Sequence, residues 1–514
     1  MKKHNTIKVV LITMLVFLLL SWILPAAYYS GQYVDQGRVQ MGLFDMFNYP
    51  LTALSYFGYI GLFFVLVGGF YGILYKIPGY RTFLERIVKI FEGKEKILLS
   101  IMVVIIAALV SICGLHFGIA LFIPFIVALI LLMGYDKITA ALVTVGGIIA
   151  GLIGTTYAVS NVGILVNSFA LDTNFEIGVR FIILLVAVVL VIFNVLMYVG
   201  FKKKDKAAKK EVKEEKVVVE KVSAKKAPAK KASVKKAPAK KTTKKSTKKG
   251  KNANKAALIE EDVIVVPAKV SGTHKIWPFV LTFSLLFVLV VLAFLPWSTW
   301  GVTAFDDATK AVQEFTLFKF PLFAKILGNF NSFGNWAITD LFLPMGLTIL
   351  ILALIYKVKL DDVFDGFIEG AKKALAPFVL TILLYTVLVI VTYHPFQLTI
   401  YKAILGMSKG FNIVATVIVG LLAGIFNSDI AYSFQAVAPY FTSIVTKVDN
   451  YPLAAVILQS MYGLAMLIAP TSLVLMGILA YLKVSYKDWL KAIWKLLLEL
   501  FVVLLIIFII LALI

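Results

Sequence analysis

Long apolar runs recur along the chain, separated by shorter polar stretches. The runs cover residues 7–27, 58–77, 138–171, 178–200, 276–296, 338–356, 376–394, 452–482 and 488–514. Each run approaches or exceeds the roughly 20 residues that an α-helix needs to cross the hydrocarbon core of a bilayer. The pattern predicts an all-α polytopic membrane protein with about nine full transmembrane helices.

Two further apolar blocks are each interrupted near their middle. The block at 97–134 is broken by Gly-Leu-His-Phe-Gly at 114–118, and the block at 411–447 by Asn-Ser-Asp at 427–429. Each block is expected to enter and leave on one side of the membrane. Hydropathy leaves two forms open, a re-entrant hairpin or a pair of full crossings.

Two of the long runs are interrupted as well. The run at 138–171 has a glycine-rich centre, and the run at 452–482 contains Ala-Pro-Thr-Ser at 469–472. Non-helical backbone persists inside a membrane only where protein or a water-filled cavity satisfies its polar groups. We expect two discontinuous helices, with each hairpin block preceding one of them.

The placement of basic residues sets the expected sidedness of the loops. Basic residues cluster near the N-terminus, at 76–96, in the 202–256 segment, at 357–373 and at 483–495, and all are expected on the cytoplasmic side of the inner membrane. Threading the chain with these constraints places the C-terminus outside. It also gives the two halves opposite orientations, so we expect inverted repeats at 1–201 and 273–514. Many secondary transporters are built in this way.

Composition changes the picture in one segment only. The net charge is +23, but residues 202–256 hold 23 lysines against five acidic residues. This stretch shows no hydrophobic period, so residues 202–272 are expected to form a disordered cytoplasmic linker. Contact with anionic lipid headgroups is the interpretation we favour. Nucleic-acid binding is disfavoured because no aromatic residues interleave the lysines.

Several classes of protein are disfavoured by what the sequence does not contain. Cys113 is the single cysteine, which leaves no disulfide framework and no cysteine-based zinc site. No P-loop, His-Glu-x-x-His or Gly-x-Ser-x-Gly motif is present. We expect a transporter without enzymatic activity or a resident cofactor. The alternative is a membrane scaffold without transport activity that uses the basic loop to bind lipid, nucleic acid or a partner.

The interrupted helices supply the first candidate binding residues. Thr155, Thr156, Ser160 and Asn161 lie within seven residues of one another in the first interrupted helix. Polar groups are costly in hydrocarbon unless they are paired or wetted. The alternative is that these hydroxyls bond back to their own helix. In the second interrupted helix, Thr471 and Ser472 follow a proline and sit where the next half-helix begins, a position that suits a carboxylate.

The hairpin tips supply the remaining candidates. Asn427, Ser428 and Asp429 form the break of the second block. A carboxylate in an apolar block indicates a functional site that takes a proton, a cation or a substrate ammonium. The alternative places Asp429 at the outer interface, where it needs no special role. His116 in the first tip is a candidate proton-relay group, although a lone histidine is more often a satisfied core residue.

Four stretches carry a resemblance to a known family. They are Met-Gly-Tyr-Asp at 133–136, Gly-Leu-Ile-Gly-Thr-Thr-Tyr-Ala-Val-Ser-Asn at 151–161, Ile-Ala-Pro-Thr-Ser at 468–472 and Val-Ser-Tyr-Lys-Asp-Trp-Leu-Lys at 484–491. The chain resembles the anaerobic C4-dicarboxylate carrier family, specifically its YfcC-type branch, within the ion transporter superfamily. The resemblance covers nearly the whole chain except the lysine-rich segment.

The resemblance implies two inverted repeats, each with one hairpin and one discontinuous helix. It also implies substrates such as C4-dicarboxylates, or amino acids such as arginine and ornithine in exchange. Coupling to Na⁺ or H⁺ and a homodimer are further expectations from the family. The expected mechanism is alternating access around a site at the middle of the membrane.

Overall fold

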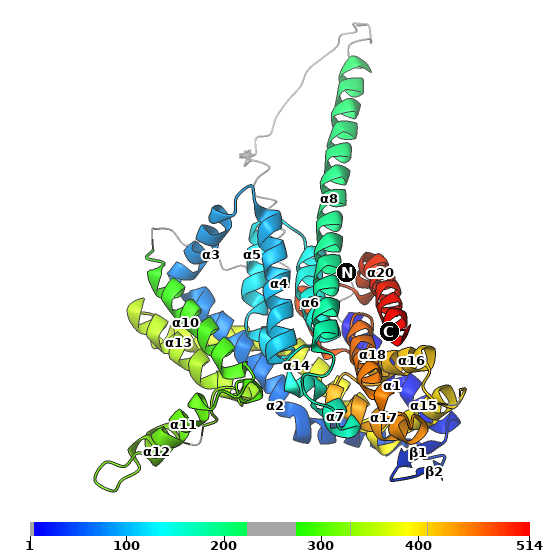
Figure 1. Ribbon diagram of the computed structural model, residues 1–514. Helices are drawn as coiled ribbons and strands as arrows, with labels where there is room; N and C mark the ends of the chain where they lie inside the picture. The colour runs from blue at the N-terminus through cyan, green and yellow to red at the C-terminus, as the bar shows by residue number, and fades with distance from the viewer. Residues whose placement is uncertain (1–4, 224–273, 329, 409, 514) are drawn as a thin grey trace, which may run out of the picture. The chain divides into compact units, whose positions relative to one another are not determined.

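The structure is a computed structural model that describes residues 5–223, 274–328, 330–408 and 410–513. Helices dominate these residues, and their only sheet has two strands (Figure 1). The first part of the chain contains α1 (Asn5–Ile23), β1 (Ala26–Tyr29), β2 (Tyr33–Gly37), α2 (Leu43–Lys76), α3 (Pro78–Ile90), α4 (Glu95–Cys113), the 3₁₀ helix η1 (Gly118–Leu121), α5 (Ile123–Leu132), α6 (Lys137–Ile153), α7 (Val159–Phe169) and α8 (Ile177–Ser223).

The second part of the chain is also helical. It contains α10 (Trp277–Phe294), η2 (Ser298–Trp300), α11 (Ala304–Glu314), α12 (Leu322–Leu327), η3 (Ile338–Leu341), α13 (Phe342–Ile355), α14 (Leu360–Tyr393), α15 (Gln397–Leu405), α16 (Ile413–Phe426), α17 (Ile430–Ile444), η4 (Val448–Asn450), α18 (Tyr451–Ala465), α19 (Leu473–Leu482) and α20 (Tyr486–Leu513). From α2 and α14 onward, the order of long helix, short helix, hairpin, broken helix and final helix is the same.

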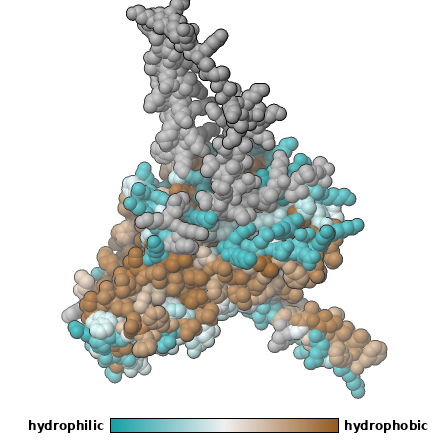
Figure 2. All heavy atoms as spheres, turned by 180° about the vertical axis from the view of Figure 1, so that it is seen from behind, coloured by the Kyte–Doolittle hydropathy of each residue, from teal (hydrophilic) through white to brown (hydrophobic). Residues whose placement is uncertain are grey.

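Eight described helices are long and apolar enough to cross a membrane. They are α1, α2, α4, the part of α8 up to Gly200, α10, α13 with its preceding η3, α14 and α20. Figure 2 shows apolar side chains gathered in a broad belt with hydrophilic residues above and below it. The predicted all-α polytopic membrane fold is confirmed.

The two hairpin blocks are built from mostly short helices. In the first, α4 and η1 lead into α5, which has 10 residues. In the second, α16 has 14 residues and α17 has 15. A helix of 10–15 residues spans about 15–23 Å, which is less than the roughly 30 Å of a hydrocarbon core. These lengths favour the re-entrant form for the second block. In the first block α5 is too short to cross, whereas α4 has 19 residues and is long enough.

The helices α2 and α14 pack against each other along much of their length. Glycines make this approach possible: a methyl group added at Gly72 would lie 2.0 Å from the carbonyl oxygen of Gly366. A methyl group at Gly370 would lie 2.0 Å from the carbonyl oxygen of Gly68. Small residues that let backbones approach closely are typical of helix pairs in membranes. Glycines on both helices therefore let the backbones of α2 and α14 approach closely.

Three elements differ from the expectations. Residues 26–37 form the antiparallel β1–β2 hairpin, where only a polar connection was expected. The helix α14 begins at Leu360, well before the apolar run expected at 376–394. The charged stretch with Asp361 and Asp362 is therefore continuous with the apolar span. Among residues 202–272, the structure describes 202–223 as a continuation of α8 rather than as disordered chain. Lysine, alanine and glutamate are strong helix formers, which accounts for helix without a hydrophobic period.

The chain divides into two compact units, Met1–Val195 with Val265–Ile514, and Leu196–Ile264. The first unit contains all the elements discussed below. The expected linker at 224–272 lies outside the described residues.

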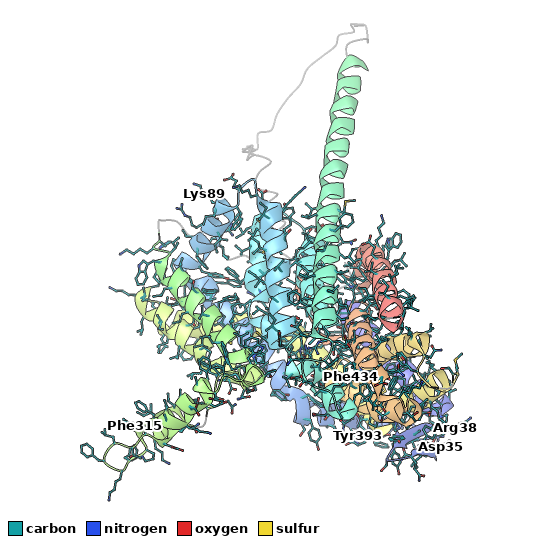
Figure 3. All side chains as sticks on the ribbon, in the orientation of Figure 1. Asp35, Arg38, Lys89, Phe315, Tyr393 and Phe434 are labelled. Atoms are coloured by element: carbon teal, nitrogen blue, oxygen red, sulfur yellow. The ribbon has the colours of Figure 1, made fainter. Side chains whose placement is uncertain are left out.

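Charged residues lie at both ends of the first unit. Figure 3 shows Lys89 of α3 at one end of the helix bundle. Asp35 in β2 and Arg38, which follows β2, lie at the opposite end. This separation fits the expected topology, in which the 76–96 stretch and the β1–β2 hairpin face opposite sides of the membrane.

Candidate functional site

The first helix break lies between α6 and α7, and α4 holds it in place. Ser111 of α4 donates its hydroxyl to the Gly154 carbonyl at 2.7 Å. The backbone N–H of Thr156 donates to the Ser111 hydroxyl at 3.1 Å, and the Thr156 hydroxyl donates to the Ser111 carbonyl at 3.2 Å. Thr156 is buried. Its polar groups are therefore used by the backbone of the break.

Replacing Ser111 with alanine is expected to lower the free energy of unfolding by about 1–3 kcal/mol, because the buried Gly154 carbonyl loses this donor. Thermal unfolding of the purified protein in detergent measures the effect. Ser100→Ala on the same helix is the matched control, since the Ser100 hydroxyl donates only to Lys96 in its own turn. Equal melting temperatures of the two variants would contradict the assigned role of Ser111.

The Thr155 hydroxyl bonds back to its own helix, which is the second of the two interpretations given for this cluster in the sequence analysis. It donates to the carbonyls of Gly151 at 3.2 Å and Leu152 at 3.1 Å, and it is fully buried. Its oxygen also accepts from Nε2 of Gln459 at 3.2 Å. Thr155 is thus occupied by contacts within the protein.

The second repeat reaches across to the first break. Gln459 of α18 donates Nε2 to the Leu152 carbonyl at 2.9 Å, and Ser460 donates its hydroxyl to the Ile153 carbonyl at 3.0 Å. These carbonyls belong to the last turn of α6, which has no further helical partners for them. The end of the half-helix α6 is therefore satisfied by side chains of α18.

The second break, between α18 and α19, is held in a similar way. Thr471 donates its hydroxyl to the Ile425 carbonyl of α16 at 2.8 Å. Ser472 accepts from the backbone N–H of Leu475 at 3.3 Å and so caps the N-terminus of α19. Trp489 of α20 donates Nε1 to the Leu467 carbonyl at 2.9 Å. Both predicted residues are buried, and their hydroxyls are engaged by backbone groups.

At the second hairpin tip, Asp429 is the N-cap of α17. Its Oδ1 accepts from the backbone N–H groups of Ala431 at 3.1 Å and Tyr432 at 3.2 Å. Asn427 holds the turn by accepting the Asp429 N–H at 2.8 Å. The Ser428 carbonyl accepts from the Tyr462 hydroxyl at 2.5 Å. One carboxylate oxygen of Asp429 thus caps a helix, and no described hydrogen bond uses Oδ2.

Tyrosines gather around the Asp429 carboxylate. The hydroxyls of Tyr59, Tyr385 and Tyr462 lie within electrostatic reach of it. Tyr385 is 1% exposed, and its hydroxyl has no hydrogen-bond partner among the described residues. Phe57 of α2 stacks on the Tyr385 ring at a centroid distance of 4.2 Å. Asp429 therefore faces the α2–α14 pair rather than open water.

At the first hairpin tip, the chain turns tightly against the start of α7. Gly114 has φ +69°, and a methyl group there would lie 2.1 Å from the Ser160 hydroxyl oxygen. His116 places Nδ1 3.0 Å from the Gly114 carbonyl. Ser160 and Asn161 form the first turn of α7, whose N-terminus has no side-chain cap. Nδ2 of Asn161 is buried and makes no well-formed hydrogen bond among the described residues, although the side chain of His116 lies nearby.

One small cavity joins both hairpin tips and both breaks. The volume open to water in it is about 10 Å³, which is room for about one water molecule. The lining residues come from the first tip, the end of α6, the second tip, α18 and the start of α19. They are His116, Phe117, Leu152, Ser428, Ile430, Tyr462, Met466, Ser472, Leu473 and Val474. His116, Ser428 and Ser472 are the predicted residues that line it.

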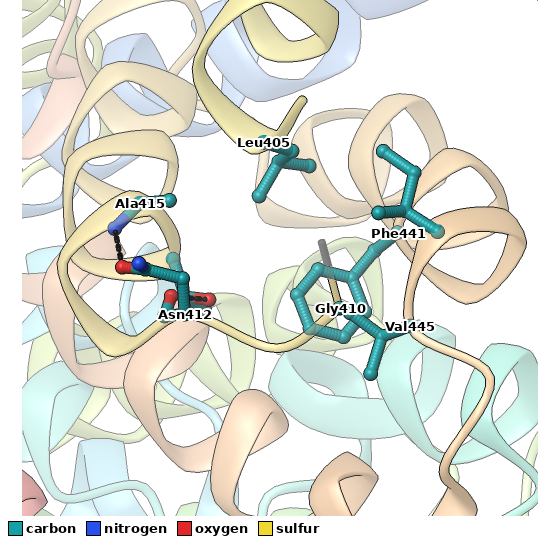
Figure 4. A pocket seen from close by; sticks show the side chains of 8 residues that line it. Leu405, Gly410, Asn412, Ala415, Phe441 and Val445 are labelled. Atoms are coloured by element: carbon teal, nitrogen blue, oxygen red, sulfur yellow. Dashed lines mark hydrogen bonds between the residues drawn. The ribbon is translucent and has the colours of Figure 1, made fainter. Parts of the chain in front are cut away.

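A second small pocket lies near the end of α15 and is shown in Figure 4. It lies between Leu405, Phe441 and Val445 and has essentially no room for a water molecule. The polar Asn412 at its edge caps α16 by accepting the Ala415 N–H at 3.0 Å. This pocket has no unsatisfied polar group aimed into it, so it is a packing space and not a candidate site.

Arg180, in the first turn of α8, was not among the candidate residues predicted from the sequence. Its side chain is 2% exposed. The available signal was a lone arginine at the start of the apolar run 178–200. Basic residues near the ends of spans usually extend to the interface, and the pattern did not distinguish this one from them.

Among the described residues, no group of three or more His, Cys, Asp or Glu side chains is placed to hold a metal ion.

The family model described as DcuC, C4-dicarboxylate anaerobic carrier, matches residues 4–241 and 245–513 of the chain. Searches of curated proteins and of solved structures gave no match.

Proposed function

Because the chain belongs to the C4-dicarboxylate anaerobic carrier family, we propose that it is a secondary active transporter of a small carboxylate-bearing metabolite. The observation that carries the proposal is the cavity shared by both hairpin tips and both helix breaks. Discontinuous segments that meet in this way form the substrate sites of many secondary transporters. The cavity combines apolar walls with His116, Ser428 and Ser472, and its volume of about 10 Å³ holds about one water molecule. The proposal therefore requires the surrounding segments to separate before a substrate binds there.

The start of α7 is the best place for a substrate carboxylate. Helix N-termini favour anions because their N–H groups are open and the helix dipole is positive there. Ser472 caps α19 and Asp429 caps α17, whereas α7 has no side-chain cap. Ser160 and Asn161 add side-chain donors in the same turn. The carboxylate site is thus proposed at α7 instead of at Thr471 and Ser472, which are engaged by the protein.

Asp429 separates the two candidate substrate classes. A carboxylate with one uncommitted oxygen and tyrosine hydroxyls nearby suits an ammonium or guanidinium group. It does not suit a second substrate carboxylate unless Asp429 is protonated. The site therefore favours an amino acid such as arginine or ornithine over a plain C4-dicarboxylate, and a proton on Asp429 is the coupling route in the second case.

The proposed mechanism is alternating access at the cavity. Hydrogen bonds join α4 to the first break, α18 to the first break and α16 to the second break. These bonds make the hairpins and half-helices one connected body. We propose that this body moves against the α2–α14 pair, in an inner-membrane protein with a cytoplasmic N-terminus and an outer C-terminus. Lipid contact through the basic segment, Na⁺ coupling and a homodimer are parts of the same proposal.

Counterflow in proteoliposomes tests the proposal. Vesicles loaded with unlabelled succinate, arginine or ornithine are given the same compound in labelled form outside. We expect transient accumulation of at least one of the three, and accumulation of arginine or ornithine supports the amino acid class. Absence of accumulation for all three, in a preparation that elutes as a single folded species, would contradict the proposal as stated.

A further inference from the structure

Arg180 is a buried cation without a counter-charge. Its Nη1 donates to the carbonyls of Thr173 and Phe175, both at 3.1 Å. Its guanidinium also lies 4.4 Å above the centroid of the Phe175 ring. Nε and Nη2 are buried and have no hydrogen-bond partner among the described residues. No ion pair of the described residues includes Arg180. A buried charge left without a partner is strongly unfavourable, so an anionic ligand is the natural complement.

The two free nitrogens define a shape as well as a charge. Nε and Nη2 lie on one edge of the planar guanidinium group, and their N–H bonds point in nearly parallel directions. This edge pairs with both oxygens of a carboxylate in a bidentate arrangement. Nη1 alone carries the contacts to the loop between α7 and α8, which leaves the bidentate edge unused.

Arg180 lies beside the first helix break. Leu184, one helical turn further along α8, touches the break directly: a methyl group at Gly154 would lie 2.3 Å from the Leu184 Cα. Residues four apart share a helix face, so Arg180 lies on the face that packs against the break. Tyr157 within the break is in electrostatic reach of Arg180. Trp300 of η2 packs edge-on against the Tyr157 ring at 5.5 Å.

The same break holds other unused donors. The N-terminus of α7 begins two residues after Tyr157 and has no side-chain cap. Asn161, in its first turn, has a buried Nδ2 that makes no well-formed hydrogen bond among the described residues. Donors without acceptors are therefore concentrated at the first break, whereas Asp429 lies at the second hairpin tip. The charge distribution around the first break suits an anion better than a cation.

We propose that Arg180 binds a carboxylate of the transported molecule at the first helix break. This inference rests on the proposed transport function and names a binding residue for it. The guanidinium edge supplies charge and orientation, and the uncapped N-terminus of α7 adds positive potential at the same break. The bound carboxylate in turn supplies the missing counter-charge.

The test compares full-length wild-type protein with Arg180→Gln, Arg180→Lys and the matched control Arg38→Gln. Arg38 is exposed, so its replacement removes the same charge from a surface position. Succinate serves as the carboxylate probe for the Arg180 site, whichever substrate class is transported, because it carries no ammonium group that would need Asp429. It is titrated against each protein, and the shift in melting temperature gives its affinity. Succinamide, which has the same skeleton without charge, is the comparison ligand. The apparent KM for counterflow is measured for whichever probe the wild type transports.

We expect succinate, and not succinamide, to stabilise the wild type and Arg38→Gln. Arg180→Gln is expected to bind succinate about tenfold or more weakly, since a charge-assisted bidentate pair is lost. The succinate affinity of Arg180→Lys is expected to lie between those of the wild type and Arg180→Gln. Lysine keeps the positive charge but cannot form the bidentate pair. If Arg180→Gln does not fold, an unchanged succinate affinity in Arg180→Lys overturns the assignment.

Two outcomes separate this inference from the proposed function. A wild-type KM and affinity in Arg180→Gln, with only a lower baseline melting temperature, would make Arg180 a clamp for the α7–α8 loop and would overturn the site while transport stands. Succinate binding that depends on Arg180, without counterflow of any probe, would support the site and contradict the transport proposal.

Discussion

Replacing Asp429 with asparagine is expected to lower the exchange of arginine or ornithine about tenfold or more while the protein stays folded. The carboxylate that pairs with the substrate cation is lost, and a charged hydrogen bond contributes roughly 1.5–3 kcal/mol. Asparagine keeps a carbonyl oxygen that accepts the Ala431 and Tyr432 N–H groups, so the cap of α17 is preserved. The substitution therefore isolates the charge. The exchange rate of each variant is measured by counterflow in proteoliposomes that contain equal amounts of protein.

The matched control is Asp136→Asn. Asp136 is also a helix N-cap, and its Oδ1 accepts the Thr139 N–H at 2.8 Å at the start of α6. The same chemical change is thus made at a helix cap that belongs to neither hairpin tip. Full exchange activity in Asp429→Asn would reduce Asp429 to a capping residue. Loss of succinate exchange as well would point to a role in coupling instead of in substrate selection.

Replacing Gly72 with alanine is expected to disrupt folding or strongly lower stability. The added methyl group would lie 2.0 Å from the Gly366 carbonyl oxygen, and 2.8 Å from the Gly370 backbone, so α2 and α14 have to separate. Overpacking typically costs about 1–3 kcal/mol, and more where backbone has to move. We expect loss of most of the monodisperse peak in size-exclusion chromatography and a large drop in melting temperature.

The control for this substitution is Gly346→Ala in α13. No atom lies within 4 Å of a methyl group at that position. Alanine has a higher helix propensity than glycine by about 1 kcal/mol, so this variant is expected to be neutral or slightly stabilising. Similar behaviour of the two variants would contradict the close α2–α14 packing.

The membrane fold was largely predictable because hydropathy reports a property of each segment by itself. The apolar runs at 178–200, 276–296 and 338–356 match α8 as far as Gly200, α10 and α13 with η3 closely. Residues Gly154 and Pro470 marked the breaks, since glycine and proline interrupt a helix wherever it lies. The β1–β2 hairpin was missed because its nine strand residues carry no clear alternation of apolar and polar positions.

The candidate site was only partly predictable, because hydrogen-bond partners come from distant parts of the chain. Thr156 lies between α6 and α7, and its hydrogen-bond partner Ser111 lies 45 residues away in the sequence. Gln459 and Leu152 are 307 residues apart. Spacing along the sequence cannot tell which hydroxyl is used by such a partner and which is free. Asn161 and Arg180 differ from their neighbours only in what surrounds them, which the sequence does not contain.

Alternating access at the cavity is tested most directly by measuring how accessible residue 428 is from each side of the membrane. Cys113 is the single cysteine and is buried, so Cys113→Ser with Ser428→Cys places one reactive thiol at the cavity. Lys89→Cys in the same background is the control and is expected to react from one side only. An impermeant thiol reagent is applied to either face of proteoliposomes. We predict that Cys at 428 reacts from both sides, about tenfold more slowly with saturating transported substrate. Reaction from one side only, or a rate that no substrate changes, would contradict alternating access at this cavity.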